Sequence, residues 1–174
     1  MRNIESKFRC ADHELIASRA ISLGARDAGL LHQHDQFFAV PRGRLKLRTF
    51  REGHSELIAY DRDDIPEARA SEYSMHRTGD PGALDEVLSR ALARTRTVEK
   101  TRRLMIYRMT RIHLDDVVGL GRFVELETVA EGQTEADAAG EHDHVVSALG
   151  LADAERISVG YVDLLSDRIE PVEA

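Results

Sequence analysis

The stretch from Phe123 to Glu127 is the feature that most limits how this chain can fold. It reads Phe-Val-Glu-Leu-Glu, and apolar and charged residues alternate in it as they do along a strand with one polar face. Glu125 and Glu127 therefore share one face. A single strand of this kind is compatible with an ordinary solvated sheet face, so the interpretation depends on how many other strands repeat the pattern.

The pattern does recur along the chain. At the N-terminus, Asn3, Glu5 and Lys7 share one strand face, and Lys46 and Arg48 alternate with Leu45 and Leu47 further on. Alternation and turn signals together predict strands over Asn3–Cys10, Gln33–Val40, Arg44–Phe50, Glu56–Arg62, Arg69–His76, Val98–Met109, Thr110–Asp116 and Arg122–Val129.

Three helices are expected between these strands. Asp12, Asp80 and Thr134 are suitable N-caps for them, and Gly24 and Gly150 end the first and the third. The segment 157–165 has a pattern that leaves its structure open. Many antiparallel strands with few helices favour an α+β fold built on a barrel or strongly curved sheet, in one domain spanning residues 1–174.

The composition narrows the functional classes. A formal net charge of -7 argues against non-specific nucleic-acid binding. No apolar run is long enough to cross a bilayer, so no membrane association is expected. The charged N-terminal strand does not resemble a signal peptide, and we therefore expect a cytoplasmic location. A single cysteine, Cys10, excludes an internal disulfide and a cysteine zinc cluster.

The charge is unevenly distributed along the chain. Residues 42–111 are rich in arginine, whereas from Glu125 onward the only basic residues are Arg156 and Arg168. This asymmetry predicts a basic interior and an acidic exterior. Because inward-pointing charges are costly unless they are paired or ligated, a charged barrel interior implies a charged ligand.

The charged positions of the strands form two sets that suit a triphosphate with a divalent metal. Cations bind phosphate oxygens, and carboxylates bind hard metal ions. The cationic set is Lys7, Lys46, Arg48, Arg62, Lys100, Arg102 and Arg111, and the anionic set is Glu5, Asp115, Glu125 and Glu127.

The stretch Asn3–Lys7 resembles the N-terminal Glu-x-Glu-x-Lys signature of the CYTH superfamily, the triphosphate tunnel metalloenzymes. Further blocks follow in family order, at 35–38, 44–48, 56–62, 69–73, 98–102, 111–115 and 119–127. The resemblance implies an eight-stranded antiparallel β-barrel that forms a tunnel, with flanking helices. It also implies an enzyme that uses Mg²⁺ or Mn²⁺ with ATP, inorganic triphosphate or thiamine triphosphate.

Site residues follow from the resemblance position by position. It implies that Glu5, Glu125 and Glu127 hold the metal with Asp115 nearby, and that Lys100, Arg102 and Asp115 take part in catalysis. The phosphates would be held by Lys7, Lys46, Arg48, Lys100 and Arg102, with Arg62 and Arg111 as further candidates. Two positions depart from the family pattern: Asn3 replaces the first signature glutamate, and Tyr60 stands where many relatives have a lysine, whose charge Arg62 could supply.

Three functions are compatible with these residues. The ending Tyr161–Leu165 is similar to that of the class IV adenylyl cyclase branch, which favours conversion of ATP to cyclic AMP and pyrophosphate. The first alternative is hydrolysis of inorganic, nucleoside or thiamine triphosphate, and the second is a non-catalytic module that binds a nucleotide or polyphosphate. The cyclase relatives suggest a homodimer.

Two His-x-His pairs could in principle bind metal. They are His32 with His34 and His142 with His144. Because no third ligand is identifiable for either pair, all four are expected to be exposed polar residues.

Overall fold

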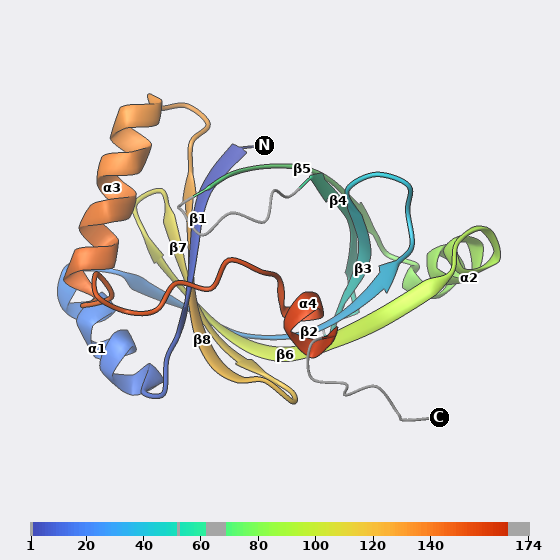
Figure 1. The fold of residues 1–174 in the computed structure, drawn as a ribbon, viewed down its shortest axis with the longest axis horizontal. Coiled ribbons are helices and arrows are strands. Elements are labelled where there is room, and N and C mark those ends of the chain that lie inside the picture. The colour runs from blue at the N-terminus through green and yellow to red at the C-terminus, as the bar shows by residue number, and fades with distance from the viewer. Residues whose placement is uncertain (1, 52, 62–68, 167–174) are drawn as a thin grey trace.

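A computed structural model of the chain describes residues 2–51, 53–61 and 69–166. In these ranges eight strands form a closed, entirely antiparallel barrel in the order β1-β5-β4-β3-β2-β6-β7-β8 (Figure 1). The strands are β1 (Arg2–Arg9), β2 (Arg26–Phe38), β3 (Arg44–Phe50), β4 (Ser55–Asp61), β5 (Arg69–Thr78), β6 (Arg94–Tyr107), β7 (Thr110–Val117) and β8 (Gly121–Val129). The predicted eight-stranded antiparallel barrel with flanking helices is confirmed.

The described part of the chain also holds four helices: α1 (His13–Leu23), α2 (Pro81–Ala91), α3 (Glu135–Ala148) and α4 (Tyr161–Ser166). The three predicted N-caps are confirmed, since each side chain accepts a hydrogen bond from a backbone N–H of the first turn: Asp12 from Leu15, Asp80 from Ala83 and Thr134 from Asp137. None of these helices has the length and apolar character needed to cross a membrane.

Strands β2 and β6 both begin earlier than the sequence pattern predicts. The first residues of β2, from Arg26 to Leu30, are exposed and show no alternation of buried and exposed positions. They are held by backbone pairing with β6, with an irregularity between Asp27 and Gly29, where Gly29 has φ 96°. The length of β2 therefore depends on pairing between segments that are distant in the sequence, and the local residue pattern does not indicate where the strand begins.

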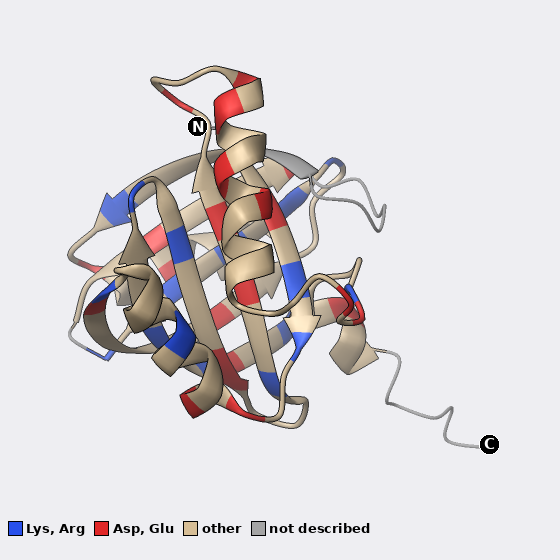
Figure 2. Ribbon diagram, turned by 90° about the vertical axis from the view of Figure 1, so that its left-hand side faces the viewer, with Lys and Arg blue, Asp and Glu red and all other residues tan. Residues whose placement is uncertain are grey.

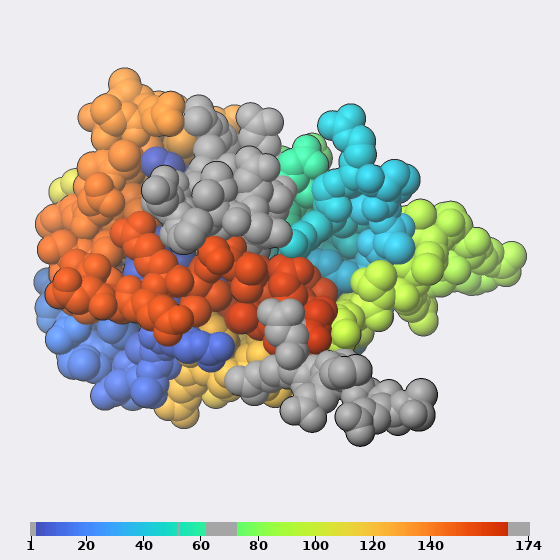
Figure 3. Space-filling view, in the orientation of Figure 1, coloured from blue at the N-terminus to red at the C-terminus, as the bar shows by residue number. Residues whose placement is uncertain are grey.

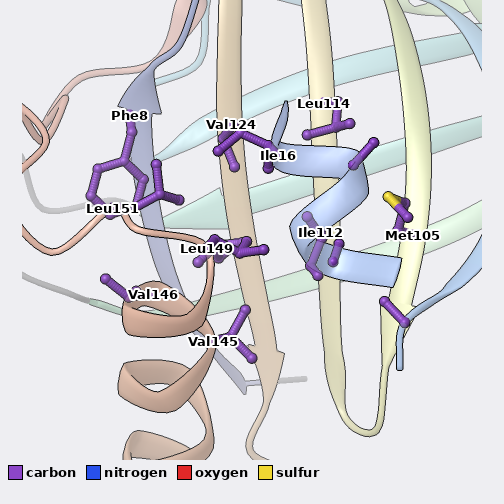
Figure 4. Close-up of a cluster of buried hydrophobic side chains, with 14 residues drawn as sticks. Phe8, Ile16, Met105, Ile112, Leu114, Val124, Val145, Val146, Leu149 and Leu151 are labelled. Atoms are coloured by element: carbon purple, nitrogen blue, oxygen red, sulfur yellow. The ribbon is translucent and has the colours of Figure 1, made fainter. Parts of the chain in front are cut away.

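The main apolar core lies outside the barrel, between its wall and the helices α1 and α3. Figure 4 shows helix residues Ile16, Val145 and Leu149 facing strand residues Ile112 and Val124. These strand positions point outward, and the positions between them point into the barrel. Because the helices bury the outward faces, the apolar core can form while charged residues occupy the interior.

A second, smaller apolar cluster closes one end of the barrel. Phe37, Val98 and Phe123 pack there against Tyr161 and Leu165 of the short helix α4. The chain after α3 crosses this face of the molecule before it enters α4 (Figures 1 and 3). The second half of the segment whose structure the sequence left open thus begins the helix α4, which covers one opening of the barrel.

His142 corrects the expectation that both His-x-His pairs are exposed. It is completely buried between α3 and the barrel, where Ser6 Oγ lies 2.8 Å from its Nε2 and Thr128 Oγ1 lies 2.9 Å from its Nδ1. Its neighbour His144 is exposed, as expected. Burial lowers the pKa of His142 from 6.5 to about 4, because the interior disfavours the charged imidazolium.

We expect His142 to make the fold sensitive to acid. The unfolded chain takes up a proton at this histidine near pH 6.5 and the folded chain only near pH 4, so the contribution to stability is complete above pH 6.5 and is lost as the pH falls. The loss amounts to about 3 kcal/mol. Urea unfolding at neutral and acid pH should therefore show a smaller acid-dependent loss for His142→Gln than for the wild type.

The exposed residue His144 provides the control on the same helix. His144→Gln should retain the acid-dependent loss of the wild type. An equal loss of stability in the wild type and in His142→Gln would show that this histidine does not set the acid sensitivity.

Candidate active site

The inward-facing side chains of the barrel line a cavity of about 490 Å³ that contains many charged groups beside apolar ones. Figure 2 shows basic and acidic residues distributed along the barrel strands, whereas α3 outside carries acidic residues without basic ones. Among the described residues, the charged groups of the lining are Lys7, Lys46, Arg48, Arg77, Lys100, Arg102, Arg111, Glu5, Asp35, Glu56, Glu125 and Glu127. The predicted basic interior is thus present, and it includes acidic side chains.

The cavity wall contains two Lys-x-Arg pairs, and each pair is bound by one buried aspartate. On β3, Lys46 Nζ donates to Asp35 Oδ2 over 2.9 Å, and Arg48 donates to both oxygens of Asp35 over 2.7 and 2.8 Å. Burial of Asp35 by itself would raise the pKa of its carboxyl, but the charges of Arg48 and Lys46 hold that pKa well below its usual range. We refer to Lys46, Arg48 and Asp35 as the β3 clamp.

The same arrangement recurs on β6. Arg102 donates to both oxygens of Asp115 over 2.6 Å each, and Lys100 Nζ lies 3.4 Å from Asp115 Oδ2. Burial would raise the pKa of Asp115, but Arg102 and Lys100 lower it by more. We refer to Lys100, Arg102 and Asp115 as the β6 clamp. In both clamps one buried aspartate on a neighbouring strand fixes a Lys-x-Arg pair.

Helix α4 extends the β6 clamp. The Tyr161 hydroxyl donates to Asp115 Oδ2 over 3.0 Å, and the ammonium groups of Lys7 and Lys100 lie 4.0 and 4.9 Å from the centre of its ring. Burial, followed by repulsion from Arg102, lowers the pKa of Lys100 to about 7. The start of α4 is therefore part of the cavity wall.

The acidic part of the wall lies on β8, next to β7 and β1. Glu125 faces Lys7 across the β1–β8 pairing, and Glu127 faces Glu5. Lys7 Nζ and Arg102 Nη2 lie 3.4 and 2.8 Å from carboxylate oxygens of Glu125. Burial by itself would raise the pKa of Glu125, but these charges outweigh it and hold the pKa well below its usual range. Burial would raise the pKa of Glu127 too, but neighbouring positive charges lower it, so both carboxylates are anions at neutral pH.

A divalent metal fits this acidic corner. Glu125, Glu127 and His113 each offer a ligand atom, and the three atoms lie within 4.8 Å of one another. Among the described residues, three buried polar atoms of the lining have no hydrogen-bond partner: Asn3 Oδ1, Gln33 Oε1 and His113 Nδ1. Carboxylate oxygens, an amide oxygen and an imidazole nitrogen are all usual ligands of divalent cations.

The structure brings together most of the residues predicted from the sequence. Lys7, Lys46, Arg48, Lys100, Arg102 and Arg111 line the cavity, as do Glu5, Glu125, Glu127 and Tyr60. Asp115 does not reach the cavity, because it is fully buried behind Arg102. Arg62 lies outside the described residues.

The lining residues that were not singled out from the sequence include Asp35, Glu56, Arg77 and His113. The signal that could have found two of them is the strand alternation itself. His113 stands between Arg111 and Asp115 on the same face of β7, and Asp35 stands two residues from Phe37, which also faces inward.

Solved structures with the same fold include one archaeal protein and one bacterial protein. The PH1012 protein of Pyrococcus horikoshii is 23% identical, with 93% of this chain and 98% of that chain aligned at a TM-score of 0.83. A Vibrio parahaemolyticus protein named "putative adenylate cyclase" is 18% identical, with 94% of this chain and 97% of that chain aligned at a TM-score of 0.78. At these identities the likeness concerns the fold.

Comparison with curated proteins gives no match. The sequence does match the CYTH domain family over residues 1–161, which is most of the chain. The barrel, its charged interior and this match together show that the chain belongs to the CYTH domain family.

Proposed function

We propose that this protein is a metal-dependent enzyme that acts on a triphosphate bound inside the barrel, and that the triphosphate is ATP. The observation that carries this proposal is the arrangement of the cavity, in which the β3 and β6 clamps provide fixed cations and Glu125 with Glu127 provides an acidic corner. A polyphosphate with a bound metal carries both kinds of complementary group.

The clamps suit phosphate binding because their cations are held in place before a ligand arrives. Arg48 and Arg102 are each fixed by two hydrogen bonds to an aspartate, so little conformational freedom is lost on binding. Arg48 and Arg102 would hold phosphate oxygens with their remaining N–H groups, and Lys7, Lys46 and Lys100 would neutralise the negative charge of the chain. A metal held by Glu125 and Glu127 would polarise the phosphate and neutralise its charge.

Within this class we propose the adenylyl cyclase reaction. The 3'-hydroxyl oxygen of ATP attacks the α-phosphorus, the bond between that phosphorus and the bridging oxygen breaks, pyrophosphate leaves and the hydroxyl proton passes to solvent. The cyclase-like ending supports this choice, because Tyr161 contacts Asp115, Lys7 and Lys100 at the site. The name of the Vibrio parahaemolyticus neighbour points to the same reaction. The cytoplasmic location and the homodimer stay predictions.

Product analysis distinguishes the cyclase from its alternatives. Purified protein incubated with ATP and Mn²⁺ or Mg²⁺ should release cyclic AMP and pyrophosphate in equal amounts, as measured by chromatography. Release of phosphate from ATP or from inorganic triphosphate, without cyclic AMP, would replace the cyclase by a triphosphatase. Tight ATP binding without turnover in either metal would instead indicate a binding module.

Removing a single carboxylate from the acidic corner should abolish metal-dependent turnover. Glu125→Gln and Glu127→Gln keep the size of the side chain and remove its charge. Loss of a residue that merely supports a metal ligand typically lowers activity ~10–100-fold. Because Glu125 and Glu127 would bind the metal directly, we expect turnover to fall by more than that. Circular dichroism should show that both variants keep the barrel.

Glu99→Gln is the matched control for these variants, because Glu99 lies on β6, points outward and is exposed. Its turnover should equal that of the wild type. Wild-type turnover in both Glu125→Gln and Glu127→Gln would refute the assigned metal corner.

We propose that Asp115 acts as a positioning residue for the β6 clamp. Its oxygens already accept hydrogen bonds from Arg102 and Tyr161, and its side chain is fully buried. Such a carboxylate fixes the direction of the guanidinium and compensates its charge in the interior, where an unpaired charge is costly.

Loss of this carboxylate should therefore destabilise the fold. Asp115→Asn leaves Arg102 with less compensation, and we expect the free energy of unfolding in urea to fall by about 3–5 kcal/mol. Asp27 provides the control, since its Oδ2 lies 2.9 and 2.8 Å from Nε and Nη2 of Arg103 in a more exposed ion pair. Asp27→Asn should cost about 1 kcal/mol or less. Equal losses in the two variants would show that burial of Asp115 is not what makes it important.

A further inference from the structure

His113 is buried in the acidic corner, and its Nδ1 has no hydrogen-bond partner. The side chain is 3% exposed and lies on β7 directly opposite Glu125 of β8. Its Nδ1 is 3.5 Å from Glu125 Oε2 without the geometry of a hydrogen bond, and its Nε2 is 3.9 Å from Glu127 Oε2. A buried imidazole nitrogen without a partner is destabilising, so a ligand that binds to it would remove this cost.

We propose that His113 is the third protein ligand of the metal held by Glu125 and Glu127, and that its nitrogen makes the site prefer Mn²⁺ to Mg²⁺. This inference rests on the proposed metal corner and goes further by naming the ligand set and the class of metal. Its basis is that one nitrogen and two carboxylate oxygens, from adjacent strands of a rigid barrel, lie within 4.8 Å of one another.

The main alternative is that His113 is a cation that neutralises the two glutamates. Two observations argue against it. An imidazolium bridging two carboxylates would make charge-assisted hydrogen bonds of about 2.7–2.9 Å, whereas the separations here are 3.5 and 3.9 Å. Positive charge is also already supplied, since Lys7 and Arg102 contact Glu125, and Arg111 contacts Glu127.

The chemistry of the ligand set determines the preference among metals. Mg²⁺ is a hard ion that selects oxygen ligands and keeps several of its waters. Imidazole nitrogen binds first-row transition metals more strongly, and Mn²⁺ is among the ions that accept both carboxylate and imidazole. A site with two carboxylates and one buried imidazole should therefore favour Mn²⁺, and loss of the imidazole should weaken Mn²⁺ binding much more than Mg²⁺ binding.

The test uses metal binding to the full-length protein without nucleotide, so it does not depend on turnover. Pulsed EPR of bound Mn²⁺ should detect a coupled nitrogen nucleus, and that signal should change when the protein contains isotope-labelled histidine. The signal should disappear in His113→Gln, and the ratio of Mn²⁺ to Mg²⁺ affinity measured by calorimetry should fall at least about tenfold. His34→Gln is the control and should retain both, because His34 is half-exposed and lies on β2.

The outcomes separate this inference from the proposed function. If Glu127→Gln loses Mn²⁺ binding while His113→Gln keeps the wild-type affinity ratio and nitrogen signal, the metal corner stands and His113 is not a ligand. If both variants bind Mn²⁺ like the wild type, the metal corner itself is refuted, and this inference with it. Should His113→Gln fail to fold, the wild-type spectrum decides alone: bound Mn²⁺ without a signal that responds to labelled histidine overturns the proposal.

Discussion

The pairing of buried charges in the barrel interior is the interaction on which the rest of this structure depends. Moving a charged side chain out of water is costly unless a partner compensates it. In this barrel the compensation is local, because Asp35 and Asp115 each bind a lysine and an arginine on an adjacent strand. The interior can therefore hold many cations in fixed directions and still belong to a stable fold.

A charged interior has consequences for the packing of the whole molecule. Apolar side chains that would fill an ordinary small barrel are displaced to its outer surface, where α1 and α3 cover β1, β6, β7 and β8 (Figure 4). A smaller apolar cluster lies at the end that α4 covers. The helices are thus required by the charged lumen, since without them the outward apolar faces of these strands would be exposed to water.

Much of the fold and part of the site were predictable because strand alternation is a local signal. Glu125 and Glu127 share a face in any strand, and so do Lys46 and Arg48, whatever the rest of the chain does. The N-caps Asp12, Asp80 and Thr134 are equally local, since each acts within one helical turn. The early start of β2 was not predictable, because only pairing with β6 defines it.

Alternation along each strand sets which residues share a face, and this local signal grouped the cations and carboxylates that were expected to line a barrel. Which of these residues reach the cavity, and which are buried behind it, depends on how the strands pair with one another. Asp115 and His113 show the difference, since both lie on the same face of β7. The register of β7 between β6 and β8 sets Asp115 opposite Arg102 and His113 opposite Glu125. The physical reason is that alternation fixes direction within one strand, whereas the partner of a buried charge is fixed by pairing between strands.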